Sequence, residues 1–466
     1  MTPIGKTGES HVYAVPLSGH YLLHAPVSGL LALVNAAAVN EVRAYLVSGQ
    51  VRDGLPSQLE DLLHRLGPPE VPDPVQRRGP LAPAFLGIIP SRRCNMACRY
   101  CDFREPGPRQ QVMDPATAVH AIDFMAEYCE RRGQKHYQIQ LFGGEPFIED
   151  RVVDVVVHHA RFVGSRIGVF PSFVVSTNGL FGPARRQFVG DFFDRVVLSL
   201  DGFREFHDRN RPISLDRPSF DEVVETARCL STARAQLCIR CCVTSESVPH
   251  LESIARWFCE KFHPIVVNFE PMTESPESRQ AGLAPPSPHD FARHALRSWQ
   301  VLRSHNCEPA SAAVFTDGLQ NTSCPVGRDA VIVHPDGLLA SCYLLPNDWE
   351  ARGMDLTIGR ILADGTVDIR MPDVLGLRRL IQSKPRCARC FCRLTCAGGC
   401  HVNHSYPGCA ERYSDSCLAI RALTAATLLE DLGQSDVAND LVEDPEALDR
   451  LSARSSDRVL DIEEWS

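Results

Sequence analysis

Cys94-Asn95-Met96-Ala97-Cys98-Arg99-Tyr100-Cys101 is the stretch around which the chain is organised. Its three cysteines have the spacing CxxxCxxC, an aromatic residue precedes the last of them, and no fourth cysteine or histidine lies close by in the sequence. A structural zinc site requires four protein ligands, whereas a [4Fe-4S] cluster held by three cysteines keeps one iron open to another molecule. The spacing therefore favours an iron-sulfur cluster with an open iron, and zinc, a disulfide or a chance arrangement remain the alternatives.

Three apolar runs further along the chain each end in glycine or small polar residues. These segments are Tyr137 to Pro146, Val174 to Gly179 and Val196 to Gly202. Apolar runs of this kind are typical of strands. In a parallel barrel, the residues at the carboxyl ends of the strands form the active face. We therefore expect the polar ends of these three segments to face the same site.

Taken in order, the cysteine stretch and the three strand ends resemble the signature of the radical S-adenosylmethionine (radical SAM) superfamily. The resemblance implies that Cys94, Cys98 and Cys101 hold a SAM-binding [4Fe-4S] cluster. The SAM contacts that it implies are Gly143 and Gly144 at the methionine end, Glu145 at the ammonium, Ser176 and Asn178 at the ribose, and Ser199 with Arg211 at the carboxylate.

Each of these residues also has a plainer interpretation. Gly143 to Pro146 reads as a turn after a strand, and Asn178-Gly179 is a favourable turn pair. Ser199 reads as a polar strand end, Arg211 as a surface arginine and Asp201 as a cap or turn residue.

A second cysteine pattern occupies the C-terminal third. It comprises Cys387-x2-Cys390-x5-Cys396-x3-Cys400, preceded by Cys324 and Gly337-x4-Cys342 and followed by Cys417. The pattern resembles the SPASM extension of peptide- and protein-modifying radical SAM enzymes. That resemblance implies one auxiliary [4Fe-4S] cluster at Cys387, Cys390, Cys396 and Cys417, and another at Cys324, Cys342 and Cys400. A zinc ribbon remains an alternative, because CxxC pairs also bind zinc.

Two departures from the family pattern narrow this interpretation. Fully ligated members have another cysteine shortly before the position of Cys324, where this chain has Asn321-Thr322-Ser323. Either Cys307 reaches that cluster or the cluster has an open iron that binds a substrate thiol, and the open site is favoured. In anaerobic sulfatase-maturing relatives an aspartate follows the cysteine of the Gx4C segment. Here Tyr343 follows Cys342, which argues against formylglycine formation.

Composition excludes several other classes of protein. The 466 residues include 48 Lys+Arg and 57 Asp+Glu, a formal net charge of -9. Without a basic run, nucleic-acid binding is not expected. No apolar run approaches a membrane span, and Met1 to Ser10 lacks a signal-peptide pattern. We therefore expect a cytoplasmic protein, in which nineteen cysteines indicate metal ligation and not a disulfide framework.

Residues 1–70 read as a separate N-terminal module. Strands are predicted at His11–Val15 and Tyr21–Leu23. Helices are predicted from Ser28 to about Val47 and from Ser57 to Leu66, the second with a Ser57 cap and Glu60 at capping-box distance. The module resembles small winged-helix-like domains that recognise leader peptides. A merely decorative subdomain packed on the barrel is the alternative.

The rest of the chain divides into a barrel and its extensions. Residues 71–84 are a proline-rich linker. Residues 85–272 alternate six strands with helices, which predicts an α/β fold, a partial (β/α)6 TIM-like barrel. Residues 273–310 are a connector and bridging helix, 311–425 the SPASM domain, and 426–466 an acidic C-terminal tail expected to be peripheral or mobile.

The expected function is that of a radical SAM/SPASM maturase of a ribosomally made precursor peptide or small protein. A 5'-deoxyadenosyl radical would abstract hydrogen from the substrate, and auxiliary clusters suit an oxidative thioether or carbon-carbon crosslink. Epimerisation, decarboxylative chemistry or oxidation of one side chain are alternatives, and no catalytic base is identifiable. Flavodoxin or ferredoxin is the expected electron donor. An iron-sulfur electron carrier or a zinc-stabilised binding protein is the alternative from another class, although neither needs Gly143-Gly144-Glu145.

Overall fold

The computed structural model gives the fold of most of the chain. It describes residues 11–67, 81–83, 85–101, 103, 111–214, 217–311, 313–320, 322, 324, 326, 329–351, 353–379, 384–402, 415–453 and 456–461. Most of the predicted linker, together with Asn321, Ser323 and Cys409, lies outside these residues. The described strands form a three-stranded sheet and an eleven-stranded sheet.

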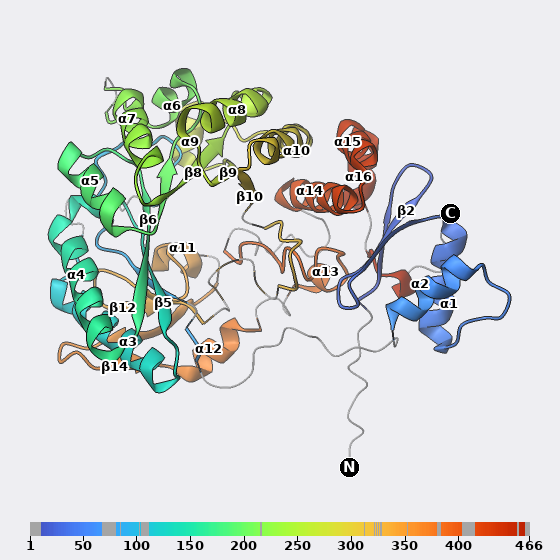
Figure 1. Ribbon diagram of the computed structural model, residues 1–466, viewed down its shortest axis with the longest axis horizontal. Coiled ribbons are helices and arrows are strands. Elements are labelled where there is room, and N and C mark those ends of the chain that lie inside the picture. The colour runs from blue at the N-terminus through green and yellow to red at the C-terminus, as the bar shows by residue number, and fades with distance from the viewer. Residues whose placement is uncertain are drawn as a thin grey trace, which may run out of the picture.

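Six parallel strands at the centre of the larger sheet form the predicted partial barrel. In chain order they are β4 (Leu86–Ile88), β5 (His136–Leu141), β6 (Phe170–Thr177), β7 (Arg195–Ser199), β8 (Gln236–Val243) and β9 (Val266–Pro271). Each pairs in parallel with the next. The helices between them include α3 (Pro115–Arg131), α4 (Asp150–Ile167), α5 (Pro183–Phe192), α6 (Arg204–Asn210), α7 (Phe220–Ser231) and α8 (Leu251–Phe262), which Figure 1 shows on the outer side of the strands. The predicted fold class is confirmed.

Side chains alternate along these strands between an apolar outer face and a polar inner one. On β5, Tyr137, Ile139 and Leu141 are buried, whereas Gln138 and Gln140 are half-buried. Successive side chains of a strand point to opposite faces, so the glutamines face the inside of the barrel. Other half-buried polar residues with this phase are Ser176, Ser199, Arg240, Asn268 and Glu270. The barrel interior is therefore lined by groups that can bind polar ligands.

Short strands extend the sheet at both edges of the barrel. The strand β10 (Glu308–Ala310) pairs in parallel with β9, and β11 (Val331–Val333) pairs in parallel with β4. Antiparallel strands β12 (Leu338–Ala340), β13 (Thr357–Ile361) and β14 (Val367–Ile369) follow β11. Short helices α11 (Pro346–Glu350), α12 (Met371–Leu377) and α13 (Pro385–Ala388) complete this part. Cys342, two residues after β12, is thereby held on the same sheet as β4, which leads into the cysteine stretch.

The N-terminal module contains a strand that the sequence analysis missed. Its sheet has the order β1 (Tyr13–Pro16), β2 (Tyr21–Ala25), β3 (Leu30–Val34), and helices α1 (Ala36–Ser48) and α2 (Ser57–Leu66) follow. The predicted helix from Ser28 is wrong over its first turns, because these residues pair with β2 instead. Asn35 then caps α1 by accepting a hydrogen bond from the Ala38 N–H at 2.9 Å.

The predicted capping box on the second helix is also wrong. The residue at the N-cap is Pro56, and no side chain caps the helix. Ser57 is already the first helical residue, so its hydroxyl is one position too late to act as the cap.

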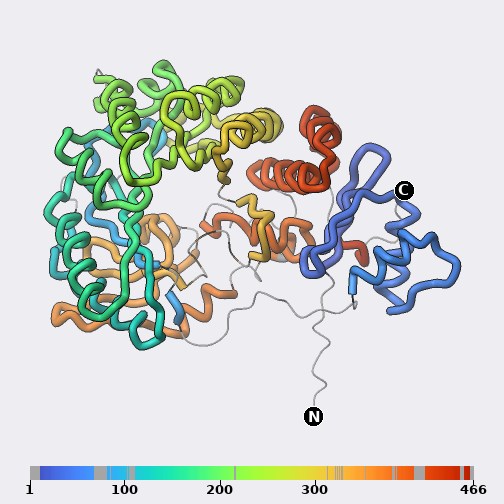
Figure 2. The backbone as a smooth tube through the Cα atoms, in the orientation of Figure 1, coloured from blue at the N-terminus to red at the C-terminus, as the bar shows by residue number. Residues whose placement is uncertain are grey.

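The C-terminal tail is folded where it is described, and the prediction of a peripheral or mobile tail is wrong there. Helices α14 (Asp415–Asp431), α15 (Ser435–Glu443) and α16 (Pro445–Ala453) pack together, and α14 and α15 also contact α10 (Pro288–Ser304). Leu441, Leu448 and Leu451 are buried. Figures 1 and 2 show α14–α16 between the barrel and the N-terminal module. The acidic composition of this region suggested a mobile tail, although its apolar residues recur with the period of a helix.

Residues 456–461, called here the C-terminal segment, attach the N-terminal module to the rest of the protein. The Ala14 N–H donates to the Asp457 carbonyl at 2.9 Å, and the Val459 N–H donates to the Val12 carbonyl at 3.0 Å. Val459 is fully buried in the core of the module. The C-terminal segment thus extends the sheet beyond β1, which leaves β3 as the opposite edge strand.

None of the helices in the described part of the chain combines the length and the apolar character needed to cross a membrane.

Candidate active site

The cysteine stretch leaves β4 and is tied down by the segment after α6. The Ala97 N–H donates to the Pro212 carbonyl at 2.8 Å, and the Arg99 N–H donates to the Asn210 carbonyl at 2.9 Å. These bonds hold the loop against the carboxyl end of β7, because α6 follows that strand.

The three thiols of this loop influence one another. Burial, with smaller contributions from the neighbouring thiols, raises the pKa of Cys94 to about 11 and that of Cys98 to about 12. Cys101 is among the neighbours of both. No set of three or more His, Cys, Asp or Glu side chains in the described residues forms a ready single-ion site. Three neighbouring thiols on one loop are a donor set that fits an iron-sulfur cluster.

Gly143 and Gly144 are required by their contact with the backbone that leads into the cysteine stretch. A Cβ at Gly144 would lie 2.0 Å from the Arg93 carbonyl oxygen, and one at Gly143, whose φ is +140°, would lie 2.6 Å from that of Ser91. The Glu145 N–H donates to the same Arg93 carbonyl at 2.7 Å. The glycine pair therefore packs the loop after β5 against the entry to Cys94.

Glu145 joins the ends of two neighbouring strands. Its carboxylate accepts hydrogen bonds from the Thr177 hydroxyl at 2.9 Å and from the Asn178 N–H at 2.7 Å. The side chain is 1% exposed, and burial raises its pKa to about 7 against the effect of these hydrogen bonds. A cationic partner would therefore stabilise its charged form, which fits the predicted contact with the SAM ammonium.

Asn178, a predicted ribose contact, bonds to the cysteine stretch, and its role at the ribose stays a prediction. Its Nδ2 donates to Asn95 Oδ1 at 2.8 Å and lies 3.6 Å from Cys94 Sγ. Asn95 in turn donates to the Leu180 carbonyl at 2.9 Å. Sequence reasoning did not single out Asn95, although it lies inside the motif. Ser176 is half-buried on β6 and faces the barrel interior.

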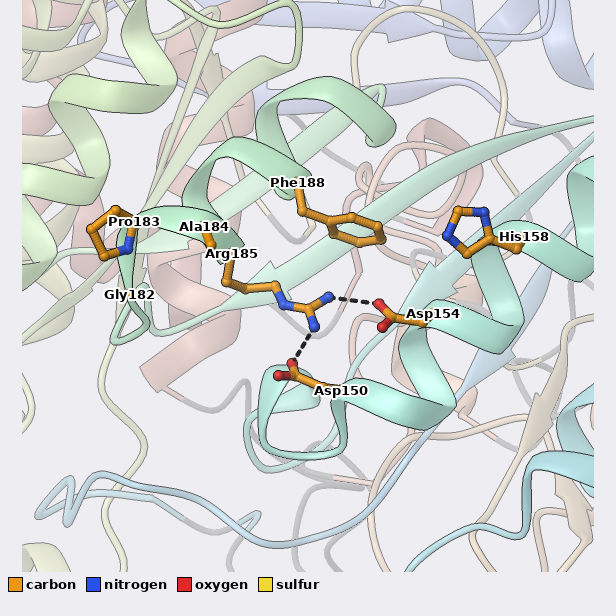
Figure 3. Close-up of a pocket in the computed structure, with 8 residues that line it drawn as sticks. All are labelled: Asp150, Asp154, His158, Gly182, Pro183, Ala184, Arg185 and Phe188. Carbon is orange, nitrogen blue, oxygen red and sulfur yellow. Dashed lines mark hydrogen bonds and ion pairs between the residues drawn. The ribbon is translucent and has the colours of Figure 1, made fainter.

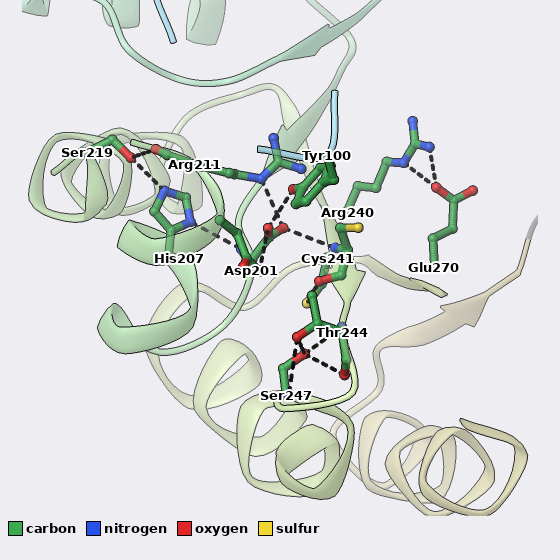
Figure 4. A network of polar contacts seen from close by, with 12 residues as sticks. Tyr100, Asp201, His207, Arg211, Ser219, Arg240, Cys241, Thr244, Ser247 and Glu270 are labelled. Atoms are coloured by element: carbon green, nitrogen blue, oxygen red, sulfur yellow. Dashed lines mark hydrogen bonds and ion pairs between the residues drawn. The ribbon is translucent and has the colours of Figure 1, made fainter. Parts of the chain in front are cut away.

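Asp201 is the centre of a buried network that the sequence analysis missed (Figure 4). This carboxylate is 0% exposed. It accepts from the Tyr100 hydroxyl at 2.5 Å and from the Cys242 N–H at 3.0 Å, and it pairs with Arg211 Nε at 2.9 Å. The predicted cap or turn role is therefore wrong for Asp201. An acidic residue directly after an apolar strand was the available signal.

Arg211 lies beside the cysteine stretch and is buried, so the plainer interpretation as a surface arginine is wrong. It is 9% exposed, and its guanidinium stacks over the Tyr100 ring at 5.3 Å. Its charge also acts on the Cys98 thiol. Ser199, its predicted partner, ends β7 next to Arg240 of β8 in the sheet register. The structure thus places both predicted carboxylate contacts at the same end of the barrel.

Arg240 and Glu270 form an ion pair on the inner faces of β8 and β9, and sequence analysis did not single out either. The Arg240 Nε donates to Glu270 Oε2 at 2.5 Å. The Arg240 side chain is 39% exposed and that of Glu270 23%, so solvent reaches the pair inside the barrel. Figure 4 shows it beside the Asp201 network.

The predicted auxiliary cysteines gather in two groups. Cys396 interacts electrostatically with Cys387, Cys390 and Cys417. Cys342 interacts with Cys324 and Cys400, and burial, reinforced by these thiols, raises its pKa to about 12. The two groups coincide with the two sets of predicted ligands, and the donor sets of both fit iron-sulfur clusters.

Cys307 does not belong to either group. It is 3% exposed, and its thiol hydrogen-bonds with that of Cys259 at the end of α8. Cys307 thus has another partner in Cys259, and an open iron at the group of Cys324, Cys342 and Cys400 stays a prediction.

Tyr343 occupies the position after Cys342 where the family comparison expects an aspartate. Its ring packs against that of Phe142 at a centroid distance of 4.8 Å. Its buried hydroxyl has no hydrogen-bond partner among the described residues, and burial raises its pKa.

A hollow of about 540 Å³ lies away from this site, between α4 and α5 (Figure 3). Arg185 crosses it and pairs with Asp150 at 2.9 Å and with Asp154 at 2.7 Å. The charge of Arg185 is thus paired with carboxylates that line the same hollow. None of the predicted site residues lines the hollow.

Comparison with known proteins agrees with this geometry. The model of the radical SAM superfamily matches residues 88–256. A cysteine-type anaerobic sulfatase-maturating enzyme of Clostridium perfringens (strain ATCC 13124) is 22% identical over 363 residues, 73% of this chain and 93% of the relative. Another, from Clostridium perfringens strain 13, is 24% identical over 230 residues, but the chain spans only 61% of its length.

A further relative matches part of the sequence, and a solved structure matches the fold. The radical SAM cyclopropyl synthase TigE of Paramaledivibacter caminithermalis is 26% identical over 133 residues, 26% of this chain and 28% of the relative. The solved structure of native anSMEcpe with bound AdoMet and Cp18Cys peptide has a TM-score of 0.56 and 20% identity. It covers 77% of this chain and 100% of that one, which shows that the fold is shared.

Proposed function

This chain belongs to the radical SAM superfamily of enzymes, and from that premise we propose that it oxidatively crosslinks a ribosomally made peptide or small protein. The observation that carries the proposal is the gathering of seven C-terminal cysteines into two groups of thiols. A domain that only cleaves SAM needs the three-cysteine loop alone. Two additional groups favour a reaction in which the substrate radical gives up an electron.

The cofactors would be held by the residues already described. Cys94, Cys98 and Cys101 would hold the SAM-binding [4Fe-4S] cluster, and the two C-terminal groups would hold auxiliary clusters. When bound, these groups supply the electron that cleaves SAM to methionine and a 5'-deoxyadenosyl radical, and an acceptor for the electron that the oxidised substrate releases. An external donor such as flavodoxin or ferredoxin would deliver the first electron.

The chain's own residues would bind and orient SAM. The buried Glu145 carboxylate would receive the ammonium, since burial raises its pKa to about 7 and a cationic partner would favour its charged form. Arg211 is held in place by Asp201 at 2.9 Å, and with Ser199 it would receive the carboxylate. The Asp201 network positions both the cysteine loop and Arg211, so it would align SAM with the cluster.

The N-terminal module would bind the leader segment of the peptide. One edge of its sheet is covered by the C-terminal segment, whereas β3 pairs only with β2 among the described strands. An extended peptide can add to such an open edge by main-chain hydrogen bonds. We therefore place the leader along Leu30–Val34.

Oxidation of a single side chain is the second candidate. It is favoured by the likeness to sulfatase-maturating enzymes over 73% of this chain. Against formylglycine formation stands Tyr343, a poor base at neutral pH because burial raises its pKa further. Tyr343 therefore favours a substrate other than a sulfatase.

The proposal is tested by anaerobic co-expression with a peptide encoded beside this chain, in deuterated water, followed by mass spectrometry. Loss of two hydrogens with a new internal bond supports crosslinking. One non-exchangeable deuterium without a new bond means epimerisation, and the crosslinking proposal falls. A modified single side chain with no new bond supports the second candidate.

A variant tests the SAM site separately. Glu145→Gln keeps the volume but cannot accept the Asn178 N–H through a second oxygen. We expect loss of SAM cleavage under dithionite with unchanged iron content. The matched control is Glu127→Gln, an exposed carboxylate on α3, which should cleave SAM normally. Full cleavage by Glu145→Gln would contradict the role given to Glu145.

A further inference from the structure

A buried arginine on α14 donates a hydrogen bond to one of the auxiliary cysteines. Arg421 Nη1 lies 3.0 Å from Cys390 Sγ and 2.6 Å from Asp457 Oδ2. Its Nη2 donates to Asp457 Oδ1 at 3.0 Å and to the Leu451 carbonyl at 2.6 Å, and Nε donates to the same carbonyl at 3.1 Å. A guanidinium has five N–H donors, so one of the five is directed at sulfur.

The surroundings of this arginine exclude water. The side chains of Arg421 and Asp457 are 1% and 0% exposed, and the guanidinium stacks over the Phe391 ring at 4.9 Å. Burying an ion pair stabilises a fold little or not at all compared with apolar residues of the same size. The packing of α14 alone therefore does not explain why two charges stand here.

Asp457 fixes the guanidinium from the opposite side. It accepts both Nη groups of Arg421 and also the Phe391 N–H at 3.1 Å. Its own N–H donates to the Arg389 carbonyl at 2.9 Å. The C-terminal segment thus holds Arg421 against the loop that carries Cys390.

We propose that Arg421 is a positioning residue that raises the reduction potential of the auxiliary cluster held by Cys387, Cys390, Cys396 and Cys417, with Asp457 orienting it. The inference rests on the proposed function, which places a cluster there. Hydrogen bonds to the sulfurs and the net charge nearby set the potential of such clusters. An N–H donor with a positive charge stabilises the reduced form, because reduction adds negative charge at the sulfurs.

Arg421 would help this cluster accept an electron. A higher potential makes the cluster a better acceptor for the electron left on the substrate after hydrogen abstraction. The hydrogen bond of Arg421 to a cysteine thiol goes to Cys390, in the group of Cys387, Cys390, Cys396 and Cys417. The two clusters should therefore differ in potential, and only one should respond to changes at Arg421.

The test is an anaerobic redox titration of the full chain followed by EPR. The background carries Cys94→Ala, Cys98→Ala and Cys101→Ala, which removes the signal of the SAM-binding cluster. The test variant is Arg421→Met with Asp457→Asn, which removes both charges but keeps an acceptor for the Phe391 N–H. A Cys390→Ser variant identifies which signal belongs to this cluster.

We expect the assigned potential to fall in the double variant. At a fixed applied potential the ratio of reduced to oxidised cluster should drop at least tenfold, which is about 59 mV for one electron. The other auxiliary potential should stay constant. The matched control, Arg303→Met with Glu430→Gln, removes a partly exposed ion pair between α10 and α14 and should shift neither.

Asp457→Asn alone separates this role from packing. It removes the negative charge but keeps one oxygen acceptor, which together with the Leu451 carbonyl holds Arg421 beside the sulfur, so the potential should rise or stay constant. A fall in Asp457→Asn, or an unchanged potential in the double variant with intact iron, overturns the inference. If the double variant loses its iron, the direction in which Asp457→Asn shifts the reduction potential decides whether the inference stands. Absence of any auxiliary signal from the background protein overturns the proposed function itself.

Discussion

Gly144 shows how a glycine can be required by contacts within the protein itself. The space where its side chain would stand is occupied by the carbonyls of Arg92 and Arg93, at 2.6 and 2.0 Å from an added Cβ. The resemblance explains the glycines by the approach of SAM. The structure adds a constraint within the protein, because the loop after β5 must lie directly on the backbone that enters the cysteine stretch.

Replacing Gly144 by alanine should therefore disturb the cluster loop. Backbone must move to relieve the contact, and overpacking of this kind costs about 1–3 kcal/mol. We expect a lower iron content and a lower melting temperature. Gly182→Ala is the control, because a Cβ there meets nothing within 4 Å. Equal iron content in the two variants would contradict this account.

The C-terminal segment shows what one short element contributes. It pairs with β1, buries Val459 in the core of the N-terminal module and places Asp457 against Arg421. The main-chain hydrogen bonds to β1 and the burial of Val459 depend on each other, because Val459 reaches the core of the module only when the segment pairs with β1 in this register. The element therefore joins the module to the auxiliary-cluster region.

Val459→Asp should detach the module. An unpaired charge in an apolar core costs about 3 kcal/mol or more, so amide exchange in β1–β3 should become faster and binding of a leader peptide weaker. SAM cleavage without peptide should persist, since the barrel is unchanged. Leu460→Asp is the neighbouring control, because Leu460 is 36% exposed. Unaltered exchange in Val459→Asp would show that the segment does not hold the module.

Across the whole molecule, histidines are buried in a neutral form in separate parts of the fold. Burial lowers the pKa of His24 in the N-terminal module and of His207 in the barrel to about 4. His207 Nδ1 accepts the Asp201 N–H at 3.2 Å, and its other nitrogen lies 3.0 Å from the Ser219 hydroxyl. Both histidines therefore bind a proton more readily in the unfolded chain than in the folded protein.

The contribution of these two histidines to stability should therefore decline with acidification, whereas Glu145, whose pKa burial raises to about 7, contributes in the opposite direction. At the histidines the unfolded chain binds more protons than the folded one between pH 6.5 and 4, so their contribution is complete above pH 6.5 and is lost as pH falls through that window. Each histidine accounts for about 3 kcal/mol in full, and about 1 kcal/mol at pH 5.5. Thermal midpoints between pH 7.5 and 5.5 measure this. His207→Asn, which keeps an acceptor for the Asp201 N–H, should show a shallower decline.

The sequence by itself determined the barrel, its cysteine loop and the two sets of auxiliary cysteines as candidates. Apolar alternation, helix periodicity and cysteine spacing are local properties, so they can be read within a window of a few residues. The six strands that the sequence predicts within residues 85–272 are present as β4 to β9. The likeness to a family supplied the chemistry that spacing alone left open.

Only the tertiary structure decided which polar groups meet. Tyr100 reaches Asp201 across 101 positions, and Arg421 reaches Asp457 across 36. Leu30–Val34 likewise forms the strand β3 because β2 lies beside it. Cys307 hydrogen-bonds with Cys259 because the fold places α8 next to it. A buried charge or thiol takes whichever partner the fold brings within hydrogen-bond distance, and local sequence carries no record of that partner.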